Sequence, residues 1–470
     1  MVSKKVQISQ EAFDAVVKEN EEDFGMELEE ALADAIHTFQ LQGADLAGII
    51  TDGRGAANLN EHPVVQAIKL LEAAVTHTEV VNDDSPDGHA IVEALNTLKQ
   101  RCVDGPPQSI AIAGRNGAVE AIINSSNLIK RKYPAVLGLA LEAFISLLED
   151  YSNRLKFSAG GPELVVDALL LNPGSVHVAG SASAIIAIAT TGNESLKQSF
   201  MDLKADEALV RLLQKPPKDL ASLQKICDAV RSLVVADDES AVTSKAYSNA
   251  RKFCRAGAAE AILKAISEAL LDPSSSSSVL ATLCVTLKAL AVNDEICKTV
   301  GESGGLEFIL QLTNECQQQR SKTLAKSACA LLGQLAGRDA NKDAIVTSGG
   351  LDRIIRLSYQ YPEDPLVLQE IMTTIAIVSL RSPVNARKAV EAGAVDMAAE
   401  VMMKHSTAAI LQRQSCQMLR NLAARNPENR VVILEKGLPA LIRNAKTNHD
   451  ICKDAASAAL RDLGFDDYNQ

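Results

Sequence analysis

Apolar and polar residues follow one another along the chain in a pattern that predicts short helices joined by tight corners. Within residues 327–336 the apolar side chains recur every three or four positions, which is typical of an amphipathic helix. We expect the polar residues 338–341 to end this helix and residues 342–346 to form a short second one. Gly349-Gly350 then predicts a sharp corner, because glycine adopts positive φ without steric cost. The next apolar helical pattern begins at Leu351.

The same layout recurs along the chain, marked by a small or polar residue, a glycine and an apolar helical run. The glycines of these copies are Gly117, Gly160, Gly257, Gly304, Gly349, Gly393 and Gly437. A degenerate copy at Lys204-Ala205 fills the wide gap before Gly257. The copies then lie 43 to 47 residues apart, except for one step of about 52, which fits armadillo or HEAT repeats of roughly 40–47 residues. A short helix that turns through glycine into a longer one favours the armadillo type.

These repeats predict an all-α fold, an armadillo-type α-α superhelix (a right-handed solenoid) of about nine repeats counted from Val64. We expect an acidic helical segment at 1–50 with helices at 9–23 and 27–42, a linker at 51–62 and the repeat domain at 63–470. The N-terminal helices are expected to cap the first repeat, because solenoids need polar-faced ends. The alternative is that they lie against the groove of the solenoid and compete with partners.

Two segments of the chain resemble the third helix of armadillo repeats: Leu419-Arg420-Asn421-Leu422-Ala423 and Leu287-Lys288-Ala289-Leu290-Ala291. The two ends of the chain resemble the armadillo repeat-containing protein 6 family. The run Gln10-Glu11-Ala12-Phe13-Asp14-Ala15 carries this resemblance at one end, and Ala458-Ala459-Leu460-Arg461-Asp462-Leu463-Gly464 carries it at the other. The resemblance covers nearly the whole chain and implies the fold, but it names no partner.

Armadillo repeats have a third helix that reads apolar-x-y-apolar, and the resemblance implies that x and y face a concave groove. This assigns partner-binding positions to Arg231, Lys288, Gln334, Arg420 and Asn421. Their charge predicts a protein partner that offers an acidic or extended segment, so the hypothesis is a non-enzymatic interaction scaffold. The competing interpretation is that these are solvated side chains on an exposed face.

Two other functional classes are disfavoured. Armadillo importins use a ladder of Trp and Asn to bind basic signals, whereas this chain has no Trp, so an importin-like cargo carrier remains only the alternative hypothesis. The chain also lacks the Gly-x-x-x-x-Gly-Lys-Ser/Thr, His-Glu-x-x-His and Gly-x-Ser-x-Gly motifs. We therefore expect no enzyme activity, no cofactor, no metal site and no small-molecule substrate.

Composition narrows the expected partners and location. The net charge of −12 disfavours nucleic acid and anionic membranes as partners, and residues 1–60 alone carry −8. No run of eighteen apolar residues spans a membrane, and residues 1–10 do not read as a signal peptide. The nine cysteines have no C-x-x-C spacing, so we expect reduced thiols and a cytoplasmic, or else nuclear, location. Cys284 and Cys297 are expected to be core thiols.

The one long step between repeats predicts an insertion of about seven residues. We place it at 236–250, after Val234, beside Arg231 and near Arg251. Insertions in repeats often lie on the binding face. A tolerated surface loop is the equally weighted alternative.

Overall fold

Small polar side chains define where many of the helices begin. Ser9, Asn193 and Asp364 each accept a hydrogen bond from a backbone N–H in the first turn of the helix that follows. Such caps satisfy N–H groups that have no partner inside the helix. They give the chain short helices with well-defined starts, which is the condition for packing them into a regular array.

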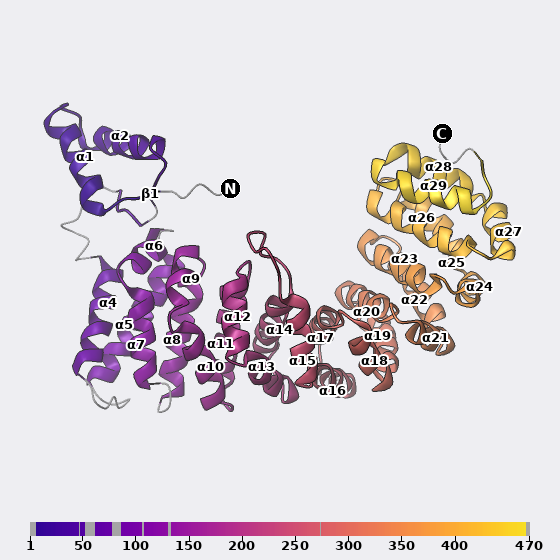
Figure 1. Cartoon of the computed structure of the whole chain (residues 1–470), viewed down its shortest axis with the longest axis horizontal. Coiled ribbons are helices and arrows are strands. Elements are labelled where there is room, and N and C mark those ends of the chain that lie inside the picture. Colours follow the sequence, from indigo (N-terminus) through magenta and orange to yellow (C-terminus); the bar gives the residue numbers. More distant parts are fainter. Residues whose placement is uncertain are drawn as a thin grey trace. The chain divides into compact units, whose positions relative to one another are not determined.

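The computed structural model describes residues 6–46, 48–51, 62–77, 86–105, 108–129, 133–272 and 274–466. The chain divides into two compact units: unit 1 holds residues 1–212 and 236–244, and unit 2 holds residues 213–235 and 245–470. Figure 1 labels their elements in chain order. Apart from one short strand pair, the regular structure of the described residues is helical. Each of these helices is too short or too polar to cross a lipid bilayer.

The N-terminal part of unit 1 has a small apolar core of its own. It consists of β1 (Val6–Gln7), α1 (Gln10–Glu22), α2 (Leu28–Leu41) and β2 (Ala44–Asp45), with the two strands parallel. The rings of Phe13 and Phe39 are buried, with their centroids 6.0 Å apart. The two helices predicted at 9–23 and 27–42 are confirmed to within one residue at each end.

The other helices of unit 1 come in a pair and then in triplets. They are α4 (Pro63–His77), α5 (Pro86–Asp104), α6 (Gln108–Arg115), α7 (Ala118–Ile129), α8 (Pro134–Leu147), α9 (Tyr151–Phe157), α10 (Gly161–Leu171), α11 (Val176–Thr190) and α12 (Glu194–Asp202). The chain passes from unit 1 to unit 2 within α13 (Ala205–Gln214). The third helices α5, α8 and α11 pack side by side, and so do the second helices α4, α7 and α10.

Unit 2 continues the same order of helices. They are α14 (Leu220–Val234), α15 (Ala246–Arg255), α16 (Ala258–Leu271), α17 (Ser277–Leu290), α18 (Asp294–Glu302), α19 (Gly305–Gln319), α20 (Lys322–Leu335), α21 (Asp339–Thr347), α22 (Gly350–Gln360), α23 (Pro365–Ser379), α24 (Pro383–Glu391), α25 (Ala394–Lys404), α26 (Ala409–Ala423), α27 (Pro427–Glu435), α28 (Leu438–Asn448), the 3-10 turn η1 (Asp450–Cys452) and α29 (Lys453–Asp462). The third helices α14, α17, α20, α23, α26 and α29 each pack against the next. We call them the third-helix row.

The armadillo-type α-α solenoid predicted from the sequence is confirmed. Within the described residues, the pair α4 and α5 is followed by triplets of a short first helix and two longer ones, giving nine repeats in all. The predicted linker at 51–62 lies almost entirely outside the described residues. The boundaries proposed for the N-terminal segment and the repeat domain therefore stay predictions.

The corner between the first and second helix of a repeat is left-handed, including the corner that lacks glycine. Gly160, Gly257 and Gly304 have φ values of 94°, 92° and 75°. Lys204 takes their place in its repeat and has φ of 62°. A lysine there is strained, because Cβ crowds the carbonyl oxygen in this conformation. The degenerate copy predicted at Lys204-Ala205 is confirmed by this geometry.

A buried asparagine near the start of several first helices joins that helix to the third helix before it. Its side-chain N–H donates to a carbonyl near the end of that preceding helix. The pairs are Asn153 with Leu147 at 2.9 Å, Asn249 with Leu233 at 2.9 Å, Asn341 with Leu335 at 3.0 Å and Asn429 with Leu422 at 2.9 Å. These carbonyls have no partner within their own helix, so the asparagines satisfy them in the dry interior.

Candidate functional site

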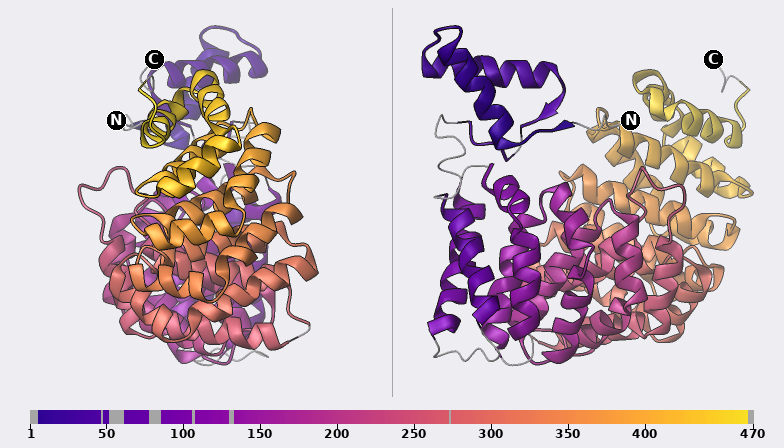
Figure 2. Two further views of the ribbon diagram at one scale, coloured as in Figure 1. Left: turned by 90° about the vertical axis from the view of Figure 1, so that its right-hand side faces the viewer. Right: turned by 60° about the vertical axis from the view of Figure 1, so that its left-hand side comes forward.

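The five residues predicted to bind a partner all lie on the third-helix row of unit 2. Arg231 is on α14, Lys288 on α17 and Gln334 on α20, while Arg420 and Asn421 are on α26. Because each of these helices packs against the next, the five positions belong to one continuous row. The orange to yellow helices at the C-terminal end of the row can be followed in Figure 2.

The side-chain amides at the y positions are hydrogen-bonded within the row. Gln334 Nε2 donates to the carbonyl of Ala291 at 2.7 Å, 43 residues earlier. Asn421 Nδ2 donates to the carbonyl of Ala376 at 2.8 Å, 45 residues earlier. Each amide therefore links its helix to the third helix of the preceding repeat. Each keeps its carbonyl oxygen and a second N–H as groups that a partner could bind.

Arg231 is held by its neighbours. Its guanidinium forms an ion pair with Asp228, one turn earlier on α14, and it donates to Thr286 Oγ1 of α17 at 3.3 Å. The aspartate balances the positive charge locally. We therefore expect Arg231 to contribute less to attraction of an acidic partner than the sequence pattern indicated.

The positive charges of Lys288 and Arg420 are less neutralised by neighbouring carboxylates than the charge of Arg231 is. Lys288 is exposed, and among the described residues it has no hydrogen bond or ion pair. Arg420 Nε lies 3.2 Å from Asp462 Oδ2 on α29, but Arg461 also binds that carboxylate, at 3.1 Å. Because Asp462 is shared between two guanidiniums, it balances the charge of Arg420 only in part.

A pocket of about 390 Å³ lies at the C-terminal ends of α23 and α26, and Arg420 and Asn421 of α26 are among the residues that line it. Its lining also includes Arg381, Arg425 and the Asp462 carboxylate. Both arginines lie outside the third helices, so the apolar-x-y-apolar pattern did not predict them. A signal for them exists in the sequence, since Arg381-Ser382-Pro383 and Arg425-Asn426-Pro427 are related runs at the same corner of successive repeats.

The predicted insertion at 236–250 is wrong in its extent. Residues 246–250 are the first residues of α15, where Asn249 is buried and bonded as described above. The loop proper, 236–244, belongs to unit 1. Within that unit, Asp237 accepts from Gly192 N at 3.1 Å and Asp238 accepts from Glu194 N at 2.9 Å. The pKa of the Asp238 carboxyl is lowered, mainly because this carboxyl accepts the hydrogen bond from Glu194 N.

A buried lysine on α12 explains why this loop packs against that helix. Lys197 of α12 is fully buried and forms ion pairs with Asp237 and, at 3.6 Å, with Glu194. A buried ammonium requires such partners, because burial removes its hydration. The loop therefore completes the first helix of the preceding repeat.

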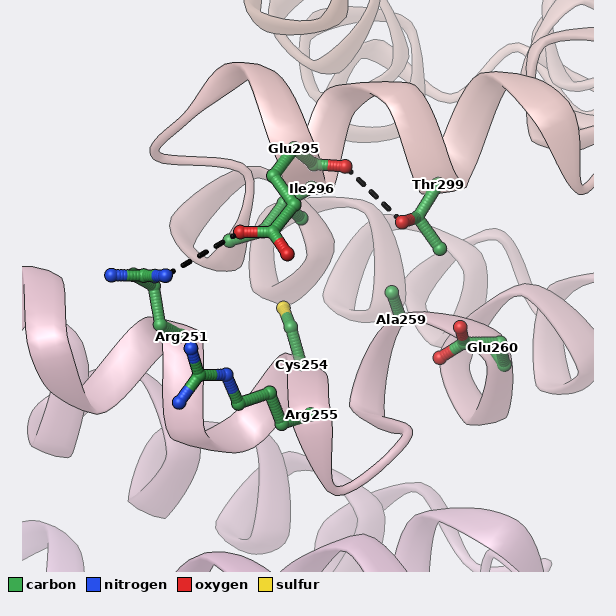
Figure 3. Close-up of a pocket in the computed structure, with 8 residues that line it drawn as sticks. All are labelled: Arg251, Cys254, Arg255, Ala259, Glu260, Glu295, Ile296 and Thr299. Carbon is green, nitrogen blue, oxygen red and sulfur yellow. Dashed lines mark hydrogen bonds and ion pairs between the residues drawn. The ribbon is translucent and has the colours of Figure 1, made fainter.

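A second, smaller pocket of about 130 Å³ combines Cys254, Arg251 and Glu295 from α15 and α18. Figure 3 shows Arg251 directed at Glu295, with 3.7 Å between Nη2 and Oε2. Burial, reinforced by the carboxylates of Glu260 and Glu295, raises the pKa of the Cys254 thiol to about 12. The thiol is therefore protonated at neutral pH, whereas a nucleophilic cysteine must be a thiolate. This pocket does not have the chemistry of a cysteine active site.

The other cysteines are also free thiols, and all but Cys254 are buried. Burial raises the pKa of Cys102 and Cys227 to about 11 and that of Cys316 and Cys416 to about 12. The prediction that Cys284 and Cys297 are core thiols is confirmed. Among the described residues, no group of three or more His, Cys, Asp or Glu side chains is placed to hold a metal ion.

Within unit 1, Arg115 of α6 connects the N-terminal segment to the repeats. Its guanidinium donates to the carbonyl oxygens of Ile8 and Asp45, each at 3.3 Å. Nearby, the Gln10 side chain exchanges two hydrogen bonds with the backbone of Ile50, at 2.7 and 3.0 Å. Ile50 is buried together with Val65 and Ile112 of the first repeats. The segment thus has both a polar and an apolar attachment to them.

Comparison with known proteins covers nearly the whole chain. The ARMC6 family model matches residues 71–467, and the Armadillo repeat-containing protein 6 N-terminal domain model matches residues 5–65. The chain is 30% identical over 397 residues to armadillo repeat-containing protein 6 of Homo sapiens, covering 82% of this chain and 76% of the relative. The homolog from Drosophila melanogaster is 28% identical over 377 residues, covering 80% and 77%.

Solved structures match the helical array at lower identity. An engineered protein of the Northeast Structural Genomics Consortium has a TM-score of 0.56 at 20% identity, covering 86% of this chain and 99% of its own. This likeness shows the fold alone. The two family models, which together match most of the chain, show more: the chain belongs to the armadillo repeat-containing protein 6 family.

Proposed function

We propose that the chain is a non-enzymatic scaffold that binds an acidic segment of a partner protein along the third-helix row of unit 2. Its family and its armadillo fold are those of a protein-interaction repeat protein. The observation that supports an acidic partner is that two cations on the row, Lys288 and Arg420, are available for binding. Lys288 is exposed and has no hydrogen bond or ion pair within the part of the chain that the structure describes, and Arg420 lines a pocket with two further arginines.

Charge supports this choice of partner. The whole chain carries −12, so cations concentrated on one row stand against the overall sign. Such a local positive surface accelerates association with an acidic segment and gives it strong salt dependence. An interface of standard size buries on the order of 800 Å² on each partner, which requires contacts over several repeats. Gln334 and Asn421 would supply hydrogen bonds to an extended backbone between the cations.

The test is charge reversal on the row. We expect Arg231→Glu combined with Lys288→Glu to abolish capture of native partners from cell extract, identified by mass spectrometry. Because Arg231 also bonds Thr286, the single variant Lys288→Glu is measured beside it, and it should weaken capture without lowering the melting temperature. Matched controls are Lys388→Glu on α24 and Arg356→Glu on α22, which reverse exposed charges on first and second helices.

Capture that is equal for the wild type and both row variants would contradict the proposal. A labelled peptide with a run of lysines, measured in the same way, separates it from the importin-like alternative. The scaffold proposal predicts no binding of this peptide, because the row repels cations, whereas a carrier of basic signals would bind it.

A further inference from the structure

The pocket between the ends of α23 and α26 is built from two equivalent corners of successive repeats. Arg381 lies in the corner between α23 and α24, and Arg425 lies in the corner between α26 and α27. Asn426 Nδ2 donates to the carbonyl of Pro383 at 3.1 Å, which ties the second corner to the first. Three arginines and one aspartate line the pocket, so its net charge is positive.

Both corner arginines have left-handed backbone. Their φ values are 58° for Arg381 and 57° for Arg425. In unit 1 the same corner, between α11 and α12, holds Gly192 with φ of 64°. Glycine adopts this conformation without strain, whereas a side chain does not. The chain thus keeps a strained residue at two corners where glycine would relax the backbone, and strain of this kind is characteristic of functional positions.

The polar groups of the pocket have capacity for a ligand. Among the described residues, Arg381 and Arg425 have neither a hydrogen bond nor an ion pair to another side chain, and both are exposed. Ser379, the last residue of α23, is 1% exposed and is one of the residues that line the pocket. Its buried hydroxyl has no hydrogen-bond partner among the described residues. A buried hydroxyl without a partner is uncommon and costs stability, so it calls for an explanation.

We propose that this pocket binds an oxyanion carried by a partner peptide, either a carboxylate or a phosphate. A guanidinium fork matches both groups by paired hydrogen bonds, and the Ser379 hydroxyl would donate a further one. The volume of about 390 Å³ accommodates one such side chain with part of its backbone, since ligand pockets span roughly 300–1,000 Å³. This inference rests on the proposed function, because it assigns to that row one end of the acidic segment.

The experiment measures fluorescence anisotropy of the full chain with three labelled peptides of one sequence that differ only at the central residue. That residue is glutamate, phosphoserine or glutamine. We expect at least one of the two charged peptides to bind ten times more tightly than the glutamine peptide. The tighter of the two identifies the source of the oxyanion. Equal binding of all three peptides, or no binding of any, overturns the inference.

The decisive variant replaces both corner arginines by glycine, Arg381→Gly with Arg425→Gly. Because glycine relaxes the left-handed corners, we expect the melting temperature to stay equal or rise while the charged peptide binds at least tenfold more weakly. Ser379→Ala removes only the hydroxyl and is expected to weaken binding about threefold. Undiminished binding in the double-glycine variant overturns the inference.

The proposed function can survive that failure. If Lys288→Glu loses native partners while the double-glycine variant keeps all of them, the scaffold proposal stands and the oxyanion pocket fails. If the double-glycine variant loses the charged peptide and Lys288→Glu keeps every native partner, the pocket stands and the extended row fails.

Discussion

Gly301 of α18 and Asn341 of α21 fit together so closely that a side chain at one excludes the present position of the other. A Cβ atom built on Gly301 would lie 2.4 Å from Asn341 Oδ1. Asn341 cannot move aside freely, because its Nδ2 donates to the carbonyls of Cys297 at 2.9 Å and Leu335 at 3.0 Å. The glycine therefore makes room for the asparagine that joins one repeat to the next.

This contact predicts that Gly301→Ala destabilises the protein. Alanine in a helix interior usually stabilises by about 0.5–1 kcal/mol relative to glycine. Here we expect a loss of roughly 1–3 kcal/mol, because the buried asparagine must give up a hydrogen bond or shift. Urea unfolding measures the difference. In the Asn341→Ala background the same Gly301→Ala change should become neutral or stabilising, and additivity of the two changes would contradict the assigned contact.

At Lys204 we expect a substitution by glycine to stabilise the protein. Replacing this lysine by glycine should raise the stability of unit 1 by about 0.5–1 kcal/mol, because it removes the strain of φ at 62°. The ion pair with Glu207 is exposed and contributes little. The matched control is Lys204→Ala, which keeps the strain and should leave the unfolding midpoint nearly unchanged. If both variants shift the midpoint equally, the strain assignment is wrong.

The loop 236–244 should depend on one ion pair. Asp237→Ala removes the carboxylate of one of the ion pairs that the buried ammonium of Lys197 forms. We expect a loss of about 3 kcal/mol and faster hydrogen exchange in α12, because removing one partner of a buried ion pair is strongly destabilising. Adding Lys197→Met to Asp237→Ala should restore most of the stability. Failure of that second change to restore it would mean that the loop acts through other contacts.

The stability of unit 2 should depend on pH in part through the carboxyl of Asp364, which caps the start of α23. Burial raises the pKa of the Asp364 carboxyl, but hydrogen bonds from Val367 N, Lys322 and Leu366 N outweigh it, so the folded pKa lies below 3.8. A depressed folded pKa means that the carboxylate stabilises the fold above the unfolded value of 3.8 and that this stabilisation disappears as pH falls through the lower folded value.

We therefore expect Asp364→Asn to flatten the fall in stability below about pH 4, measured by urea unfolding at a series of pH values. The control is Glu391→Gln, which changes an exposed carboxyl at the end of α24. An acid dependence identical in the wild type and Asp364→Asn would refute this origin.

The N-terminal segment should behave as an end cap. Arg115→Ala removes two hydrogen bonds to its backbone, so we expect the segment to lose about 1–3 kcal/mol of attachment and to become sensitive to limited proteolysis, while the repeats persist. Deleting residues 1–50 should lower the melting temperature of unit 1 without raising partner affinity. A rise in affinity would instead support competition between the segment and the partner.

Much of this architecture follows from the sequence because its signals are local. The corner glycines fix where each repeat turns, and the apolar spacing fixes which helix faces are buried. Even the corner at Lys204 could be placed, since the repeat period required a turn there. The bonding of the candidate residues could not be predicted. Nothing adjacent in sequence indicates that Asn421 bonds the carbonyl of Ala376 or that Thr286 contacts Arg231.

The sequence pattern predicts binding residues only on the third helices, so it does not indicate residues in the corners between helices. Arg381 and Arg425 lie between helices, and their importance appears only when the ends of α23 and α26 enclose a pocket. The insertion was misplaced for a similar reason. A length excess locates extra residues only approximately, whereas the buried bond from Asn249 to Leu233 decides that α15 begins at Ala246.

The fit between Gly301 and Asn341 also restricts which module can precede the one that begins with α21. In α21, Val346 occupies the position that Gly301 has in α18, three residues before the corner glycine. A chimera carrying α21 in place of α18 would therefore present a branched side chain to the asparagine of the following module. The modules that contain α18 and α21 therefore cannot be exchanged as interchangeable parts, and a designer who transplants one of them must transplant the two as a neighbouring pair.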